Sequence, residues 1–206
     1  MSLPVPTKRR SSIPAAGMLL ALSVLLPAPR AFGGGEAGFE AFNEGDYETA
    51  LAVWQPLAES GDADSQFGLG QLYGNGFGVN MDDALAIKWY SAASAQGHAE
   101  ASYRLGVMYQ NGWGVEQSDV EMLRYFELAA DGGFVEAHRS LGDMYANGFG
   151  VEADPVKSFR YYTTAAMLGD IGSEISAEEI AGTMPPEQVA EGKKLAESWI
   201  AEHAQR

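Results

Sequence analysis

The apolar positions of this chain recur with a fixed spacing through its central part. Within each copy the spacing places four positions on one face of an α-helix. The matching positions are Ser65, Leu69, Leu72 and Tyr73; Ala101, Leu105, Met108 and Tyr109; and Ala137, Leu141, Met144 and Tyr145. Each copy starts 36 residues after the previous one. A fixed period of this length is typical of a solenoid, in which a unit buries its apolar face only against its neighbours.

A second helix is expected in each unit, because each first helix is followed by a capping residue, an aromatic pair and a closing glycine. Ser118 with Glu121 also fits a capping box. The three sets are Asp82, Trp89–Tyr90 and Gly97; Ser118, Tyr125–Phe126 and Gly133; and Asp154, Tyr161–Tyr162 and Gly169. The aromatic pairs are expected to pack against neighbouring helices, with a ligand cage as the alternative. The pattern therefore predicts an all-α fold of antiparallel helix hairpins.

A glycine interrupts the first helix of every unit, at Gly70, Gly106 and Gly142. Glycine inside a helix costs about 1 kcal/mol relative to alanine. We therefore expect a neighbouring helix to approach so closely at these positions that a side chain would push it away.

Each hairpin turn places an aromatic residue between two glycines. The three turns are Gly76-Phe77-Gly78, Gly112-Trp113-Gly114 and Gly148-Phe149-Gly150. A phosphate-binding loop is excluded because no strand precedes the glycines and no Lys-Ser/Thr follows them at the required spacing. We expect these aromatic side chains to fold inward, with an exposed binding surface as the alternative.

The two ends of the chain depart from the repeat. A basic patch, Lys8 to Arg10, precedes an apolar run from Ala15 to Leu26. That run is shorter than the roughly 20 residues a membrane span needs, so residues 1–33 are predicted to be a signal peptide. The protein is then exported, to a bacterial periplasm in the simplest case. The alternative is an uncleaved N-terminal anchor.

The remaining chain is predicted to divide into three parts. Residues 34–63 form a partial repeat, residues 64–172 form three full repeats, and residues 173–206 form C-terminal capping helices. In the last helix one apolar face is expected from Val189, Leu195, Ala196, Trp199 and Ile200. Such a helix would hide the open end of the stack.

The composition of the chain argues against several classes of function. The chain has 28 acidic residues against 13 Lys plus Arg, a formal net charge of −15, which disfavours nucleic-acid binding. It has no cysteine, and its three histidines, His98, His138 and His203, are expected on the surface. No metal-binding or catalytic spacing occurs among them. We therefore predict no enzyme activity, no cofactor and no metal.

The repeat also resembles a known family. The order Ala-x-x-x-Leu-Gly-x-x-Tyr-x-x-Gly-x-Gly-Val, then an aromatic pair, then Ala-Ala-x-x-Gly, is similar to that of the Sel-one-like repeat (SLR) family, a relative of tetratricopeptide repeats. The resemblance covers about residues 64–172. It implies a right-handed α-solenoid with a scaffolding role in protein complexes. Some cysteine-rich members resemble hydrolases of β-lactam drugs, but the absence of cysteine here gives no reason to carry that activity over.

Some positions of the first helices change between repeats instead of staying apolar. They lie at i, i+4 and i+7, so each set forms one helix face. Their chemistry changes from aromatic to charged along the array, as expected of a groove that binds an extended or helical peptide. The predicted groove consists of Phe67, Gln71, Tyr103, Val107, Gln110, Arg139 and Asp143.

The predicted function is a non-enzymatic adaptor that scaffolds a complex by binding a protein or peptide. One alternative is a structural component of an envelope or polysaccharide-export assembly, and a second is a hydrolase. Phe67 and Tyr103 belong either to the groove or to the core.

Overall fold

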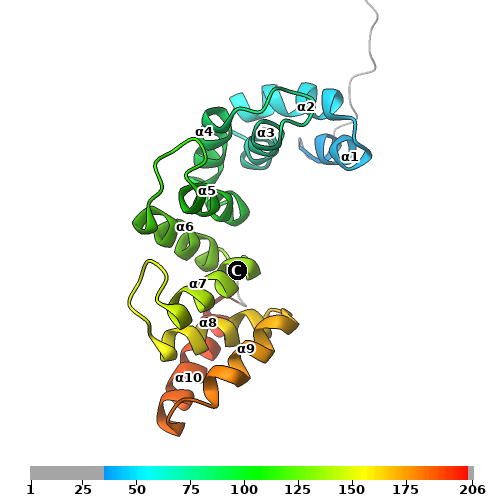
Figure 1. Ribbon diagram of the computed structural model, residues 1–206. Coiled ribbons are helices and arrows are strands. Elements are labelled where there is room, and N and C mark those ends of the chain that lie inside the picture. The colour runs from blue at the N-terminus through cyan, green and yellow to red at the C-terminus, as the bar shows by residue number, and fades with distance from the viewer. Residues whose placement is uncertain (1–34, 204–206) are drawn as a thin grey trace, which may run out of the picture. The chain divides into compact units, whose positions relative to one another are not determined.

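The protein is described by a computed structural model that covers residues 35–203 (Figure 1). The predicted signal peptide, residues 1–33, lies outside the described residues. Within residues 35–203 every regular element is a helix, which confirms the all-α prediction. The helices are α1 (Glu36–Glu44), α2 (Tyr47–Glu59), α3 (Ala63–Asn75), α4 (Asp83–Ser94), α5 (Ala99–Asn111), α6 (Asp119–Asp131), α7 (Val135–Asn147), α8 (Pro155–Met167), α9 (Ile171–Ala181) and α10 (Pro186–His203).

The helices from α1 to α9 pack in the order in which they occur, each against the one before it (Figure 1). The contacts are most extensive within the hairpins α3–α4, α5–α6 and α7–α8. The buried clusters nevertheless cross from one hairpin to the next. One cluster joins Phe126 of α6 to Leu141 of α7, and another joins Tyr90 of α4 to Leu105 of α5. The interior is therefore continuous from hairpin to hairpin, as a solenoid requires.

The predicted caps begin the second helix of each hairpin. The Asp82 carboxylate accepts the N–H of Leu85 at 2.9 Å, and the Asp154 carboxylate accepts the N–H of Lys157 at 3.0 Å. The backbone N–H of each capping residue donates back to the tyrosine that ends the apolar stripe of the preceding helix. The three pairs are Asp82 to Tyr73 at 2.9 Å, Ser118 to Tyr109 at 3.1 Å and Asp154 to Tyr145 at 2.9 Å. The turn is thus fixed at both of its ends.

The capping box expected at Ser118 and Glu121 is only half formed. The Ser118 hydroxyl accepts the N–H of Glu121 at 3.3 Å. The return bond is missing because the Ser118 N–H already donates to Tyr109, and the Glu121 carboxylate pairs with Arg124 at 2.8 Å.

Replacing Asp82 by alanine is expected to lower the free energy of unfolding by about 1 kcal/mol, because the N–H of Leu85 then loses its acceptor. Denaturant unfolding followed by circular dichroism measures the change. Asp82→Ser keeps an acceptor and should cost less. Equal stability of Asp82→Ala and the unaltered protein would contradict the cap.

The glycines inside the first helices lie directly under aromatic rings of the second helices. A Cβ placed on Gly70 would lie 2.4 Å from the Tyr90 ring. The corresponding distances are 2.5 Å from Gly106 to Phe126 and 2.6 Å from Gly142 to Tyr162. Real Cβ atoms do not approach other atoms so closely, so the expected helix approach is confirmed. In each hairpin, the glycine is required by the second residue of the aromatic pair on the second helix.

The last helix packs on the last full hairpin, as expected of a capping helix. α10 contacts α8, where Gly192 lies under the Phe159 ring at a Cβ distance of 2.7 Å. Trp199 is buried, whereas Leu195 is exposed. On α9 both Ile171 and Ile175 remain exposed. α10 therefore covers part of the third hairpin, and apolar surface remains exposed on α9.

Candidate protein-binding site

Two clefts of the same construction lie where one hairpin meets the next. We call them the first and second junction clefts. The second, between α5, α6 and α7, has a volume of about 620 Å³, whereas the first has about 90 Å³. The second cleft is lined by Gln110, Met122, Phe126, Ser140, Asp143, Met144, Asn147 and Phe149. The first is lined by Gly74, Asn75, Asp83, Tyr90, Arg104, Val107, Met108 and Trp113.

Most lining residues of the two clefts correspond to each other at the repeat spacing, and several of the corresponding pairs differ in size. Ser140 stands in the second cleft where the long Arg104 side chain stands in the first, and Phe126 lacks the hydroxyl of Tyr90. These exchanges remove atoms from the second cleft. Gln110 in place of Gly74 adds atoms there, but the second cleft is still the larger. The replacement of arginine by serine is the largest loss of volume among them.

The aromatic residues at the turn tips do not behave alike. Phe77 folds inward and stacks on Tyr47 with ring centroids 4.9 Å apart, as expected. For the other two turns the expectation of inward folding is wrong, because Trp113 is 53% exposed and Phe149 is 63% exposed. Each of them stands at the rim of a junction cleft.

The reason lies in the residue that each turn meets. The second glycine of each turn packs against the first residue of the preceding second helix: Gly78 on Tyr47, Gly114 on Asp83 and Gly150 on Asp119, with Cβ distances of 2.6 to 2.8 Å. Tyr47 offers a ring on which Phe77 can stack. The aspartates that replace it offer no such ring. The chain therefore leaves Trp113 and Phe149 exposed, each next to a carboxylate.

The predicted groove residues fall into different surroundings. Val107 lines the first cleft, and Gln110 and Asp143 line the second. Gln71 is half-buried on α3 and lines neither cleft.

The other three predicted groove residues engage partners within the chain. Phe67 is 4% exposed and stacks on His98 with centroids 4.4 Å apart, so it belongs to the core. Tyr103 stacks on Phe126 at 5.3 Å. Arg139 faces the Asp170 carboxylate at 3.9 Å. Of the predicted positions, the structure thus brings Gln110 and Asp143 together in the lining of one cleft.

The second cleft has an apolar floor and a polar rim. Met122, Phe126 and Met144 form the floor, and all three are buried. On the rim the Asp143 carboxylate accepts the Tyr162 hydroxyl at 2.6 Å. Burial, and then this bond to Asp143, raise the pKa of Tyr162 well above its usual range, so the phenol stays protonated and donating. A carboxylate has room for further donors, so Asp143 can still accept a hydrogen bond from a ligand.

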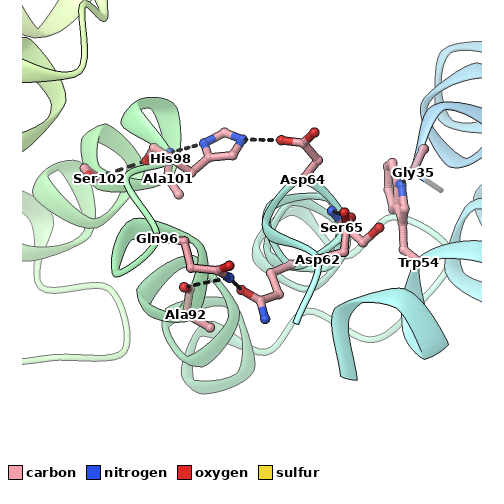
Figure 2. A network of polar contacts seen from close by, with 11 residues as sticks. Gly35, Trp54, Asp62, Asp64, Ser65, Ala92, Gln96, His98, Ala101 and Ser102 are labelled. Atoms are coloured by element: carbon pink, nitrogen blue, oxygen red, sulfur yellow. Dashed lines mark hydrogen bonds and ion pairs between the residues drawn. The ribbon is translucent and has the colours of Figure 1, made fainter. Parts of the chain in front are cut away.

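A second polar cluster joins the first two hairpins (Figure 2). His98 Nδ1 accepts the N–H of Ala101 at 3.2 Å, and His98 Nε2 lies 3.6 Å from the Asp64 carboxylate. Ser102 is close, but its hydroxyl pairs with Ser94 at 2.7 Å and with the His98 carbonyl at 3.3 Å instead of with the imidazole. The bond between nucleophile and base that a serine hydrolase uses is therefore not made in this cluster. The cluster caps α5 and ties it to α3.

His138 is not on the surface, contrary to the expectation. It is 1% exposed, between Tyr161 of α8 and Trp199 of α10, at centroid distances of 6.0 and 4.6 Å. Burial, together with the nearby charge of Arg160, lowers its pKa to about 4. Its position in the repeat is also that of Gln66 and Ser102, both buried. The burial of His138 could have been predicted from the sequence, because three polar residues share this repeat position next to the apolar stripe.

Among the described residues, no three His, Cys, Asp or Glu side chains are grouped closely enough to hold a metal ion. In the same part of the chain, every helix is too short or too polar to cross a membrane.

Comparison with known proteins identifies a family and two similar solved structures. A family model for the Sel1 repeat matches residues 63–98, 99–134 and 135–170. The crystal structure of a Sel1 repeat protein from Oxalobacter formigenes is similar, with 34% sequence identity and a TM-score of 0.59, over 63% of this chain and 97% of that one. That of c5321, a protective antigen present in uropathogenic Escherichia coli strains that displays an SLR fold, has 21% identity and a TM-score of 0.58, over 84% of this chain and 46% of that one.

One curated relative is also similar over a short segment. It is an exopolysaccharide production negative regulator from Rhizobium leguminosarum bv. viciae, 37% identical over 59 residues. That segment is 29% of this chain and 22% of the relative.

Proposed function

Because the chain belongs to the Sel1 repeat family, whose members typically mediate protein–protein interactions, we propose that it is a non-enzymatic adaptor that binds a protein or peptide partner at its junction clefts. The stacked hairpins hold the binding surface in place, and no chemical step is involved. The polar groups of the rim that can accept further hydrogen bonds hold the partner in place, and the apolar floor buries a side chain of the partner.

One observation carries this proposal. The second junction cleft is a concave surface with an apolar floor, a polar rim and an exposed aromatic residue, Phe149. Exposed aromatic side chains next to such a cleft are typical of binding hot spots. Trp113 repeats the arrangement at the first cleft.

The proposed compartment is the bacterial periplasm or envelope. The support is the sequence of residues 1–33, with its basic patch and short apolar run. The alternative is that this segment stays attached as an anchor. Protease accessibility in spheroplasts, and the N-terminal sequence of the mature protein, distinguish the two.

The test is affinity capture with the double variant Trp113→Ala/Phe149→Ala as bait. We expect the partner captured from an envelope extract by the unaltered chain to be reduced at least tenfold, because both exposed rings are removed. The melting temperature should change little, because neither ring is buried. Val120→Ala is the matched control, since Val120 is also exposed but lies outside both clefts. Undiminished capture by the double variant would contradict the proposal.

A role in an envelope or polysaccharide-export assembly is the second candidate. It is favoured by the similarity of 59 residues to a regulator of exopolysaccharide production. Deleting the gene and measuring secreted exopolysaccharide tests it. An unchanged amount would count against this role while leaving the adaptor function intact.

A further inference from the structure

We propose that the second junction cleft binds an arginine side chain of the partner. The inference rests on the proposed function and names the chemistry that the cleft recognises. It is drawn from the first cleft, which shows how the same construction accommodates an arginine.

An arginine of the chain itself lines the first junction cleft. Arg104 lines it together with Tyr90, the exposed Trp113 and Asp83, and its guanidinium donates to the Glu100 carboxylate of its own helix at 2.8 Å. With that side chain present the open volume is about 90 Å³. The corresponding residue of the second cleft is Ser140, and about 620 Å³ is open there. The second cleft therefore has open space beside the position where its homologue carries an arginine side chain.

The lining of the second cleft suits the two parts of an arginine side chain. Met122, Phe126 and Met144 are buried apolar residues on which the three methylene groups can lie. At the rim, Phe149 offers a ring face for cation–π stacking. The Asp143 carboxylate and the Gln110 side-chain oxygen can accept the N–H groups, and charge-assisted bonds of this type are strong.

The charges around the cleft favour a cation. Asp143 is the one charged residue among those that line it, and Asp119 lies against the turn that carries Phe149. The chain as a whole has a net charge of −15. An acidic or phosphorylated side chain would be repelled, whereas an arginine would be attracted at long range and held at short range.

The test selects peptides from a random 12-residue display library with the full chain as bait. We expect the selected peptides to share an arginine. The variant Ser140→Arg places an arginine where the first cleft has one, so it should fill the second cleft and lose these peptides. Arg104→Ser, which changes the first cleft alone, should leave the selected peptides unchanged, because Val107 and Gly74 stand there in place of the acceptors Asp143 and Gln110.

A selected peptide is then synthesised with arginine and with citrulline, which has the same shape without the charge. Calorimetry should show at least tenfold weaker binding of the citrulline peptide, and a comparable loss for Asp143→Asn with the arginine peptide. Peptides without a basic residue, or the same peptides selected by Ser140→Arg, would overturn the inference while leaving the adaptor function intact. No selected peptide from any bait would contradict the inference and peptide binding together.

Discussion

Replacing Gly106 by leucine should lower the free energy of unfolding by about 3 kcal/mol, because the new side chain would occupy the place of the Phe126 ring. The ring lies 2.5 Å from the position of the added Cβ, and the Met122 carbonyl lies at 3.4 Å. Both atoms belong to α6, so the two helices of the second hairpin would have to separate. Denaturant unfolding gives the change in free energy.

The matched control is Gly172→Leu. Gly172 is the second residue of α9, and the nearest atom to its added Cβ is 3.8 Å away and belongs to the Asp170 side chain. Leucine forms helices better than glycine by somewhat less than about 1 kcal/mol, so this variant should be neutral or more stable. Similar effects of the two substitutions would show that helix propensity, and not the approach of α6, decides the outcome at Gly106.

The second large effect is a loss of stability in acid that depends on His138. The pKa of His138 is lowered from 6.5 to about 4 in the folded chain, chiefly by burial and further by Arg160 and His203. Above pH 6.5 the imidazole is neutral in both states. As the pH falls below 6.5, the unfolded chain takes up the proton first, so the folded state loses stability until the pH reaches about 4. The full loss from this group is about 3 kcal/mol.

The variant His138→Gln isolates this contribution from the carboxylates that also titrate in acid. Glutamine suits the site because Gln66, at the same position of the first repeat, is buried and donates to the Ala58 carbonyl at 3.1 Å. The difference in unfolding free energy between the variant and the unaltered chain should change between pH 7 and pH 4. A difference that stays constant over this range would mean that His138 titrates alike in both states.

Much of the fold could be predicted from the sequence because the same glycine–aromatic contact between two helices recurs in all three repeats. Gly106 and Phe126 recur at one spacing as Gly70 with Tyr90 and Gly142 with Tyr162, and each pair is one contact between helices. The period also fixes which hairpins are neighbours. The right-handed course of the superhelix stays a prediction.

The terminal helix could not be placed in the same way because it occurs once. An apolar face on α10 shows that the helix packs, but not whether it packs on α8 or α9. The same face includes the buried Trp199 and the exposed Leu195.

The candidate site was predicted only in part, because a cleft depends on residues from three helices. Gln110 and Asp143 were found from their variation between repeats. The floor residues Met122 and Met144 were recognised only as core, since nothing in the spacing shows which core atoms border an opening. Phe149 was noticed, but its exposure depends on Asp119, the first residue of α6, which corresponds to Tyr47, the first residue of α2.

The most direct test of the account is photo-crosslinking from position 149 in living cells. A benzoylphenylalanine placed there lies at the rim of the second junction cleft, whereas the same group at position 120 lies on an exposed helix position outside both clefts. We expect a discrete adduct with a partner protein from position 149, absent from position 120 and lost when Ser140→Arg is added. An adduct from position 120 and none from position 149 would place the binding surface elsewhere and contradict the account.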